Sequence, residues 1–160
     1  MFNFFKKKNT FSLISPMTGE IIAIGQVPDS VFAEKMVGDG LAIKPTEEIV
    51  VAPCDGKIIQ IFPTKHAIGI ETSEGIQILI HVGLDTVALN GRGFESFIQA
   101  GDDVKQGDKL LKIDLKLIQN YASSAISPIV ITNMDKVEEL SVEQGKVTRG
   151  ESKIMDIYRK

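Results

Sequence analysis

The chain has 160 residues, of which 43% are hydrophobic, and a formal net charge of −3 at pH 7. This length fits one domain with a hydrophobic core, and the negative charge, without a lysine and arginine cluster in the body of the chain, argues against a nucleic-acid-binding protein. The single cysteine, Cys54, excludes an internal disulfide framework, and no apolar run is long enough to cross a bilayer, so we expect a cytoplasmic protein.

Residues 1–11 read as a flexible tail ahead of a single domain that spans residues 12–160. The tail combines an aromatic stretch, Met1 to Phe5, with a basic cluster, Lys6 to Lys8. Two interpretations stay open. The tail could make a peripheral contact with an anionic membrane surface, or it could be solvated and bind nothing.

From Ser12 onward, short β-type runs alternate with turn residues. The pattern predicts strands over Ile21–Ile24, Glu48–Val51, Lys57–Phe62, Ala67–Glu71, Ile76–Val82, Lys109–Asp114, Ile129–Thr132, Lys136–Val142 and Lys153–Tyr158. Helical periodicity is weak, and only Ser30–Met36 and Leu115–Tyr121 are plausible helical turns. We therefore predict an all-β fold, an antiparallel sandwich or barrel-like structure of the barrel-sandwich hybrid kind.

One turn-then-strand element occurs twice in the chain. Residues 15–24 and 52–61 share the positions of a proline, a glycine and several isoleucines. The repeat predicts two pseudo-equivalent strands, each entered through a proline turn and a glycine at a kink.

The two histidines, His66 and His81, fall on the two arms of one predicted hairpin. With an even loop, either Ser73–Glu74 or Thr72–Gly75, antiparallel pairing places His66 opposite His81. Opposed residues have Cβ atoms about 4.5 to 5.5 Å apart, so the imidazoles would meet edge to edge. A three-residue loop would break this register.

Apolar neighbours would keep both imidazoles neutral. Ile68 and Leu79 are expected on the face of the histidines, where burial and mutual repulsion lower the pKa of each ring. One neutral imidazole could then carry a phosphoryl group while the second hydrogen-bonds the phosphoryl oxygens. Thr64, two residues before His66, is placed to fix the tautomer of that ring. Alternatively, each histidine only packs on a β surface.

Glycine and aspartate turns around residues 52–58 and 100–111 resemble the framework of biotinyl and lipoyl carrier domains. Those carriers present one modified lysine on a tight hairpin. The candidate here, Lys116, arrives one residue early and lacks the flanking residues of a modified lysine. We expect a shared scaffold rather than a shared prosthetic group.

Four strings carry a more specific resemblance, namely residues 27–40 (VPDSVFAEKMVGDG), 63–69 (PTKHAIG), 80–87 (IHVGLDTV) and 127–133 (SPIVITN). They resemble the glucose-class enzyme IIA component of the bacterial phosphoenolpyruvate-dependent sugar phosphotransferase system, from about Ser12 to the C-terminus. The resemblance implies a monomeric cytoplasmic phosphotransferase component with a barrel-like β-sandwich. It would accept a phosphoryl group from phospho-HPr and donate it to a cysteine on the IIB domain of a membrane sugar permease.

The resemblance also implies roles for individual residues. His81 matches the histidine that is phosphorylated on Nε2, His66 the histidine that supports phosphoryl donation, and Thr64 the hydroxyl behind it. Asp29 and Asp85 match acidic residues beside the site, suited to an arginine on HPr. The apolar docking rim of the family corresponds to Val31, Phe32, Met36, Val37, Phe62, Ile68, Leu79 and Val87.

The resemblance implies no required cofactor. In one complex of an enteric relative, a zinc ion joins the two histidines to a carboxylate of the partner. His66 and His81 alone would leave a tetrahedral ion half-coordinated, so we expect zinc to bind weakly without a partner. Regulatory partners known for enteric relatives are not carried over. A purely regulatory binding module with vestigial histidines stays open as an alternative.

Overall fold

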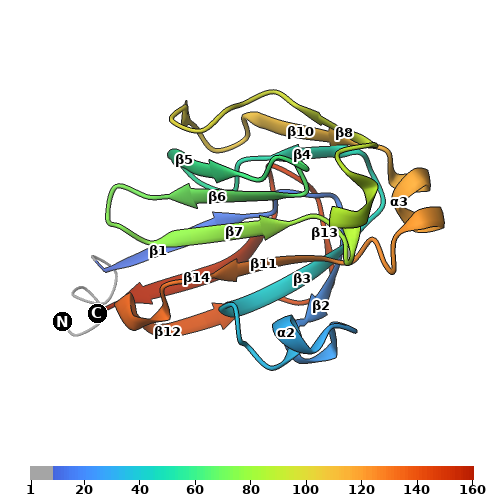
Figure 1. The fold of residues 1–160 in the computed structure, drawn as a ribbon. Coiled ribbons are helices and arrows are strands. Elements are labelled where there is room, and N and C mark those ends of the chain that lie inside the picture. Colours follow the sequence, from blue (N-terminus) through green and yellow to red (C-terminus); the bar gives the residue numbers. More distant parts are fainter. Residues whose placement is uncertain (1–8) are drawn as a thin grey trace.

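The structure, a computed structural model, describes residues 9–160. Its strands and helices in chain order (Figure 1) are β1 (Thr10–Ile14), β2 (Gly19–Ala23), η1 (Ile24–Gln26), α2 (Ser30–Ala33), β3 (Asp39–Pro45), β4 (Ile49–Val51), β5 (Gly56–Ile61), β6 (Ala67–Glu71), β7 (Gln77–His81), η2 (Thr86–Leu89), β8 (Phe94–Ser96), β9 (Asp103–Val104), β10 (Lys109–Ile113), α3 (Leu115–Tyr121), β11 (Ser127–Ile131), η3 (Met134–Lys136), β12 (Val137–Val142), β13 (Lys146–Val147) and β14 (Lys153–Arg159).

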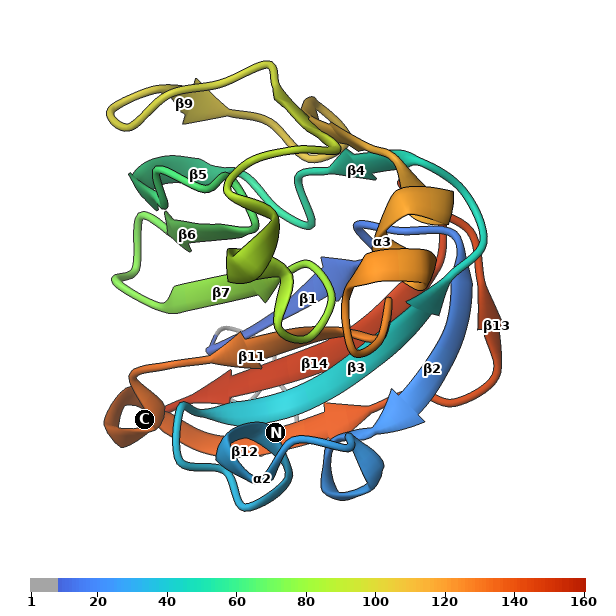
Figure 2. The same ribbon diagram turned by 45° about the vertical axis from the view of Figure 1, so that its right-hand side comes forward.

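The described strands form three antiparallel sheets. The largest has eight strands in the order β13-β2-β3-β11-β7-β6-β5-β9, and the two smaller sheets have the orders β1-β14-β12 and β4-β10-β8. The smaller sheets lie over the inner face of the large one, and Figure 2 shows them closing the structure around a common interior. The predicted all-β sandwich is therefore confirmed. No helix of residues 9–160 is long and apolar enough to span a bilayer.

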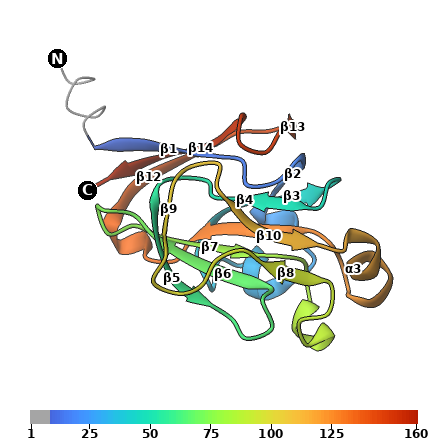
Figure 3. The ribbon, with the colours of Figure 1, turned by 90° about the horizontal axis from the view of Figure 1, so that it is seen from above.

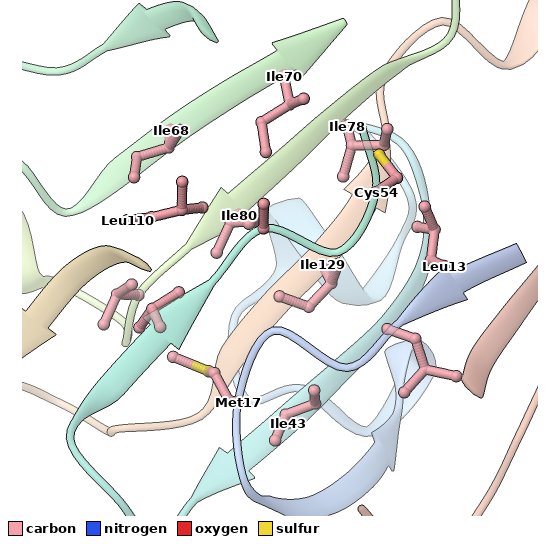
Figure 4. Packing of buried hydrophobic residues seen from close by; sticks show 14 of the residues in the cluster. Leu13, Met17, Ile43, Cys54, Ile68, Ile70, Ile78, Ile80, Leu110 and Ile129 are labelled. Carbon is pink, nitrogen blue, oxygen red and sulfur yellow. The ribbon is translucent and has the colours of Figure 1, made fainter. Parts of the chain in front are cut away.

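The middle of the large sheet is buried on both of its faces. Ile78 and Ile80 of β7 point into the main core, which Figure 4 shows between the sheets, whereas Leu79 between them packs on the opposite face. Strands β3 and β11 alternate in the same way, because successive side chains of a strand point to opposite faces. The outer face carries a second, smaller apolar cluster that includes Phe32 of α2.

All nine predicted strands and both helical turns are present; Ala67–Glu71 and Leu115–Tyr121 have the predicted bounds, and the others have shifted ends. The prediction missed β1, β8, β9 and β13 among the described strands, and also β3, although β3 is a central strand paired with β2 and β11. A strand buried on both faces lacks the polar and apolar alternation that marks a half-buried strand. The sequence also contains Gly40 at this point, and a glycine argues against a strand assignment. In the structure the glycine is required, because a Cβ atom at position 40 would lie 2.3 Å from the carbonyl oxygen of Ile129.

At the N-terminus, β1 pairs with β14 from Thr10 onward, so the sheet begins two residues before the predicted domain start at Ser12. Of the expected tail at residues 1–11, residues 1–8, with the aromatic and basic stretches, lie outside the described residues, and Thr10 and Phe11 belong to β1.

The internal repeat is confirmed as two equivalent strand entries. Strand β2 begins at Gly19 and β5 at Gly56, each after a proline turn. Both glycines approach a neighbouring strand closely, since a Cβ atom would lie 2.1 Å from the carbonyl oxygen of Lys44 at Gly19 and 2.7 Å from that of Glu71 at Gly56. Each glycine is therefore needed for close backbone packing.

Helix α3 lies at the end of the molecule opposite the C-terminal end of β14 (Figure 3). Lys116 is part of this helix and not of a tight hairpin between strands. The geometric basis for reading Lys116 as a modified carrier lysine is thus missing.

Candidate functional site

The β6–β7 hairpin has a different register from the predicted one. Ala67, not His66, lies opposite His81, and Thr72 hydrogen-bonds to Ile76 across the end of the hairpin (Thr72 N to Ile76 O, 2.9 Å). The loop is therefore the odd one, three residues from Ser73 to Gly75, and Gly75 has a φ of +88°. A left-handed glycine at the end of a three-residue loop is a common way to close a hairpin. The predicted pairing of His66 with His81 was wrong.

The two histidines nevertheless meet, because His66 lies in the turn before β6 and not within the strand. In that turn Lys65 has a φ of +61°, which breaks the side-chain alternation on which the predicted register depended. The carbonyl oxygen of His66 accepts a hydrogen bond from the Val82 N–H (2.7 Å). The imidazole centroids are 5.0 Å apart with an interplanar angle of 77°.

Two phenylalanines extend this pair into a row of four rings. The Phe32 ring lies 5.0 Å from the His81 ring, and the Phe62 ring lies 5.3 Å from the His66 ring. The Phe62–His66 pair is an edge contact and the Phe32–His81 pair a tilted one, and ring contacts at these separations are favourable. The order Phe32, His81, His66, Phe62 places an apolar ring at each end of the histidine pair, in which His66 is buried and His81 is half-buried.

The hydrogen bond of His81 assigns its tautomer. Its Nδ1 lies 2.8 Å from the carbonyl oxygen of Gly83, which can only accept, so Nδ1 carries the proton of the neutral ring and Nε2 keeps a lone pair. Burial lowers the pKa of His81, opposed by the Gly83 carbonyl and by the negative charges of Asp29 and Asp85. The ring is therefore a neutral imidazole with a nucleophilic Nε2 near pH 7.

His66 is held by the predicted hydroxyl, since Thr64 Oγ1 lies 2.6 Å from His66 Nδ1. Burial, and secondly the nearby His81, lowers the pKa of His66 to about 4. Only 3% of His66 is exposed. It stays neutral at physiological pH, and the hydroxyl of Thr64 is placed to set which ring nitrogen carries its proton.

The depressed pKa of His66 makes stability depend on pH. The unfolded chain binds a proton at His66 near pH 6.5 but the folded chain only near pH 4, so the unfolded state binds more protons between these values. The free energy of unfolding should therefore fall as the pH drops from 6.5 to 4, by roughly 3 kcal/mol from this group. Urea unfolding across this range should show a flatter pH dependence for His66→Gln than for the native chain. Parallel curves would contradict the low pKa.

Both predicted carboxylates lie beside His81 on ordered backbone. Asp29 caps α2, where its Oδ1 accepts a hydrogen bond from the Val31 N–H (3.0 Å). Asp85 has a φ of +60° and accepts a hydrogen bond from the hydroxyl of Ser123. Each carboxylate is therefore oriented before any partner arrives.

The apolar residues predicted for the rim divide into exposed, half-buried and buried side chains. Met36, Val87 and Val31 are 71%, 55% and 40% exposed, and Val37, Phe62 and Leu79 are half-buried. Phe32 is buried beneath them and contacts His81 rather than solvent. Ile68 is fully buried in the main core, so its place on the rim was wrong; the register shift turned it to the inner face.

The two imidazoles could supply at most two of the four ligands of a tetrahedral zinc ion. Nδ1 of His81 and Nδ1 of His66 are engaged by Gly83 and Thr64, which leaves the two Nε2 atoms as metal ligands. Residues 9–160 contain no cluster of three His, Cys, Asp or Glu side chains able to hold a metal ion. Any further ligands must come from outside these residues.

Two serines that support the site, Ser123 in the α3–β11 loop and Ser127 at the start of β11, were not predicted as site residues. Ser123 binds Asp85, and Ser127 accepts a hydrogen bond from the Gly83 N–H (3.0 Å). Gly83 itself carried the one available signal, because a glycine two residues after a histidine fits a turn with positive φ, here +71°. The serines, about 40 residues further along the chain, carry no local pattern that points to the histidines.

Comparison with known proteins supplies a family match. Residues 11–137 match a family described as "phosphoenolpyruvate-dependent sugar phosphotransferase system, EIIA 1". The chain is 48% identical over 146 residues to a protein of Staphylococcus epidermidis named "PTS system glucose-specific EIIA component", covering 91% of this chain and 88% of the relative. It is also 48% identical over 161 residues to a protein of the same name from Bacillus cereus, covering 100% of this chain and 98% of the relative.

A solved structure has the same fold. It is described as glucose permease IIA from Mycoplasma capricolum and superposes with a TM-score of 0.86 at 42% sequence identity, covering 92% of this chain and 95% of the other. The resemblance seen in the four sequence strings is thus confirmed over nearly the full length of the chain.

Proposed function

Because the chain belongs to the EIIA 1 family of the phosphoenolpyruvate-dependent sugar phosphotransferase system, we propose that it is the phosphocarrier between phospho-HPr and a IIB domain. In this proposal His81 accepts the phosphoryl group on Nε2 and passes it to a cysteine of IIB. The relatives are named glucose-specific, so the IIB domain of a glucose permease is the natural first acceptor to test.

The observation that carries the proposal is the hydrogen bond from His81 Nδ1 to the carbonyl oxygen of Gly83 (2.8 Å). It leaves the Nε2 lone pair available in a ring that burial keeps neutral. When Nε2 attacks the phosphorus of phospho-HPr, the new N–P bond forms as the N–P bond of the donor breaks, and the electron pair of that bond stays on the donor imidazole. Nδ1 keeps its proton, so Gly83 stabilises the product ring.

Donation reverses the roles of the two bonds. A thiolate of the acceptor attacks the phosphorus, the Nε2–P bond of His81 breaks, and its electron pair returns to Nε2. His66 contacts the His81 ring and is oriented by Thr64, so it is placed to donate a hydrogen bond to the phosphoryl oxygens as charge shifts. In this proposal His81 reacts, and His66 and Thr64 assist its release of phosphate.

The exposed rim provides the docking surface of the proposal. Met36, Val87 and Val31 form its apolar part, and Asp29 and Asp85 supply negative charge next to His81. An apolar patch with acidic residues at its side fits partners that present an apolar surface with an arginine. One small face would then serve donor and acceptor in turn.

Loss of both carboxylates should slow docking of phospho-HPr. The double variant Asp29→Asn with Asp85→Asn removes the charges, while asparagine at position 29 keeps the helix cap. The second-order rate constant of phosphorylation should fall on the order of 10-fold at low ionic strength, and the difference from the native chain should shrink at high salt. Stopped-flow mixing at several salt concentrations measures this, and a difference that does not change with salt would count against charge steering.

Zinc belongs to the proposal only as a ligand shared with a partner. We propose that the Nε2 atoms of His66 and His81 supply two ligands and a partner carboxylate a third. The chain alone should then bind zinc weakly, which calorimetric titration with zinc alone would test. Because Nε2 of His81 is also the proposed phosphorylation site, bound zinc and the phosphoryl group would exclude one another.

The decisive experiment for the function is phosphoryl transfer with purified partners. Incubation of the chain with phospho-HPr should yield an acid-labile, base-stable adduct, and addition of a IIB domain should remove it. Absence of the adduct would overturn the proposal. A regulatory module with vestigial histidines predicts instead that the chain binds its partners equally well with and without phosphorylation, whereas a phosphoryl group on His81 should weaken an apolar interface.

A further inference from the structure

The α3–β11 loop lies against the segment that carries the Gly83 carbonyl. The Leu84 N–H donates to the carbonyl oxygen of Ser124 (2.8 Å), and the Ser123 N–H donates to the carbonyl oxygen of Leu84 (3.2 Å). The Gly83 N–H donates to the hydroxyl of Ser127 (3.0 Å), which in turn donates to the carbonyl oxygen of Ala125 (2.9 Å). The α3–β11 loop and the first residue of β11, both distant in sequence, thus hold the turn that follows His81.

These contacts fix both peptide groups next to the α-carbon of Gly83. The Gly83–Leu84 peptide accepts from His81 Nδ1 through its carbonyl and donates to Ser124 through its N–H. The Val82–Gly83 peptide accepts from the hydroxyl of Thr86 (2.6 Å) and donates to the hydroxyl of Ser127. The position of the carbonyl that selects the His81 tautomer therefore depends on groups outside the β7 strand.

Gly83 makes such fixing necessary. Its φ of +71° suits glycine, and a Cβ atom would lie 2.6 Å from Cγ2 of Thr86 and 2.9 Å from the carbonyl oxygen of Ser124. A glycine backbone has more rotational freedom than that of any other residue, so its carbonyl keeps one direction only if hydrogen bonds hold it. Ser127 is fully buried, and its hydroxyl makes one donor and one acceptor contact within the protein.

We propose that Ser127 is a positioning residue for His81, acting through Gly83. Its hydroxyl holds the Val82–Gly83 peptide so that the next carbonyl faces Nδ1, which keeps the neutral ring in the tautomer with a free Nε2. Only the kinetic consequence of this inference rests on the proposed phosphocarrier function. The effect on the tautomer stands on geometry alone.

A matched pair of variants separates the hydroxyl from the volume of the side chain. Ser127→Thr keeps a hydroxyl at this position. Ser127→Val introduces a side chain of nearly the same shape as threonine but without the hydroxyl. Imidazole ¹⁵N spectra recorded above the pKa of His81 should show Nδ1 protonated in the native chain and in Ser127→Thr. In Ser127→Val, His81 should become a mixture of the two neutral tautomers.

The rate of phosphorylation by phospho-HPr should follow the tautomer. We expect a fall of roughly 10-fold for Ser127→Val, at the lower end of the range for groups that orient a functional imidazole, and near-native rates for Ser127→Thr. Ser124→Ala is the control, because the hydroxyl of Ser124 accepts from the Ile126 N–H (3.0 Å) while only its backbone carbonyl holds Leu84. It should leave the His81 tautomer unchanged.

Two results would overturn the inference. The first is the native His81 tautomer in folded Ser127→Val. The second is an equal change of the His81 tautomer in Ser127→Val and Ser127→Thr, which would mean that side-chain packing and not the hydroxyl is responsible. Thermal unfolding verifies that each variant is folded, and Ser127→Ala, which only removes the hydroxyl, provides the same spectroscopic comparison if the larger side chains do not fit. If the native chain accepts no phosphate, the proposed function fails while the spectra still decide the role of Ser127.

Discussion

Replacing His81 by alanine is expected to abolish phosphorylation of the chain by phospho-HPr, with a loss of more than about 10⁴-fold, the scale seen when a nucleophile is removed. The reason is that Nδ1 of His81 is hydrogen-bonded to the Gly83 carbonyl, which leaves Nε2 as the nucleophile in the proposed function. His66 cannot readily replace it, because only 3% of that residue is exposed. Acid-labile phosphate on the protein, measured by mass spectrometry at neutral pH, reports the result.

His81→Gln serves as a second variant, since it keeps a polar side chain of similar length beside Phe32. Far-UV circular dichroism and the thermal midpoint show whether both variants keep the native fold. An adduct that persists in either folded variant would place the phosphoryl group elsewhere, with His66 the next residue to examine. Such a result would remove the basis for assigning unequal roles to the two rings.

Replacing His66 by glutamine is expected to separate acceptance of the phosphoryl group from donation. In acceptance, the breaking bond belongs to the donor protein, and this chain supplies only the lone pair of His81. In the proposed donation step, the breaking bond is on His81 itself, and charge shifts next to His66, whose ring lies 5.0 Å from that of His81. We expect acceptance to change less than 10-fold and donation to a IIB domain to fall roughly 10²- to 10³-fold, as when one hydrogen-bond donor to a developing charge is lost.

Single-turnover transfer from the isolated phosphoprotein to IIB measures the donation step directly. Thr64→Val, which removes the hydroxyl next to His66 Nδ1 and keeps the shape of the side chain, should show a smaller loss in the same step. Thr64→Ser is the control for this variant, because serine retains a hydroxyl at position 64. Equal losses in acceptance and donation for His66→Gln would mean that His66 supports the fold of the site rather than the release of phosphate.

The hairpin shows how far local patterns reach. The strand segments on both arms are correct, but the loop length is not readable from the sequence, since Gly75 fits even and odd loops alike. A change of one residue in the register sends every side chain to the other face. For this reason Ile68 faces the core and not the rim. His66 still contacts His81, because it lies in the turn before β6 and not within the strand.

The central strand β3 and the supporting residues Ser123 and Ser127 were not predicted, for a different reason. Strand β3 has neighbours on both faces, and this double burial is a property of the assembled sheets. Ser123 and Ser127 reach Asp85 and Gly83, which flank the His81 turn, only after β11 pairs with β7, about 40 residues away in the chain. Neither feature has a local periodicity that a sequence pattern could reveal.

The sequence by itself determined the fold class, most of the strands and the repeated proline and glycine turns, because short-range periodicity carries this information. It also singled out His66 and His81 as candidate site residues, because histidine is scarce in this chain. Only the tertiary structure decided how the histidines meet, which apolar residues face solvent and what fixes the His81 tautomer. These depend on strand register and on hydrogen bonds between distant segments, which form when the sheets pack. The partnership of Gly83 with Ser127 is of this second kind.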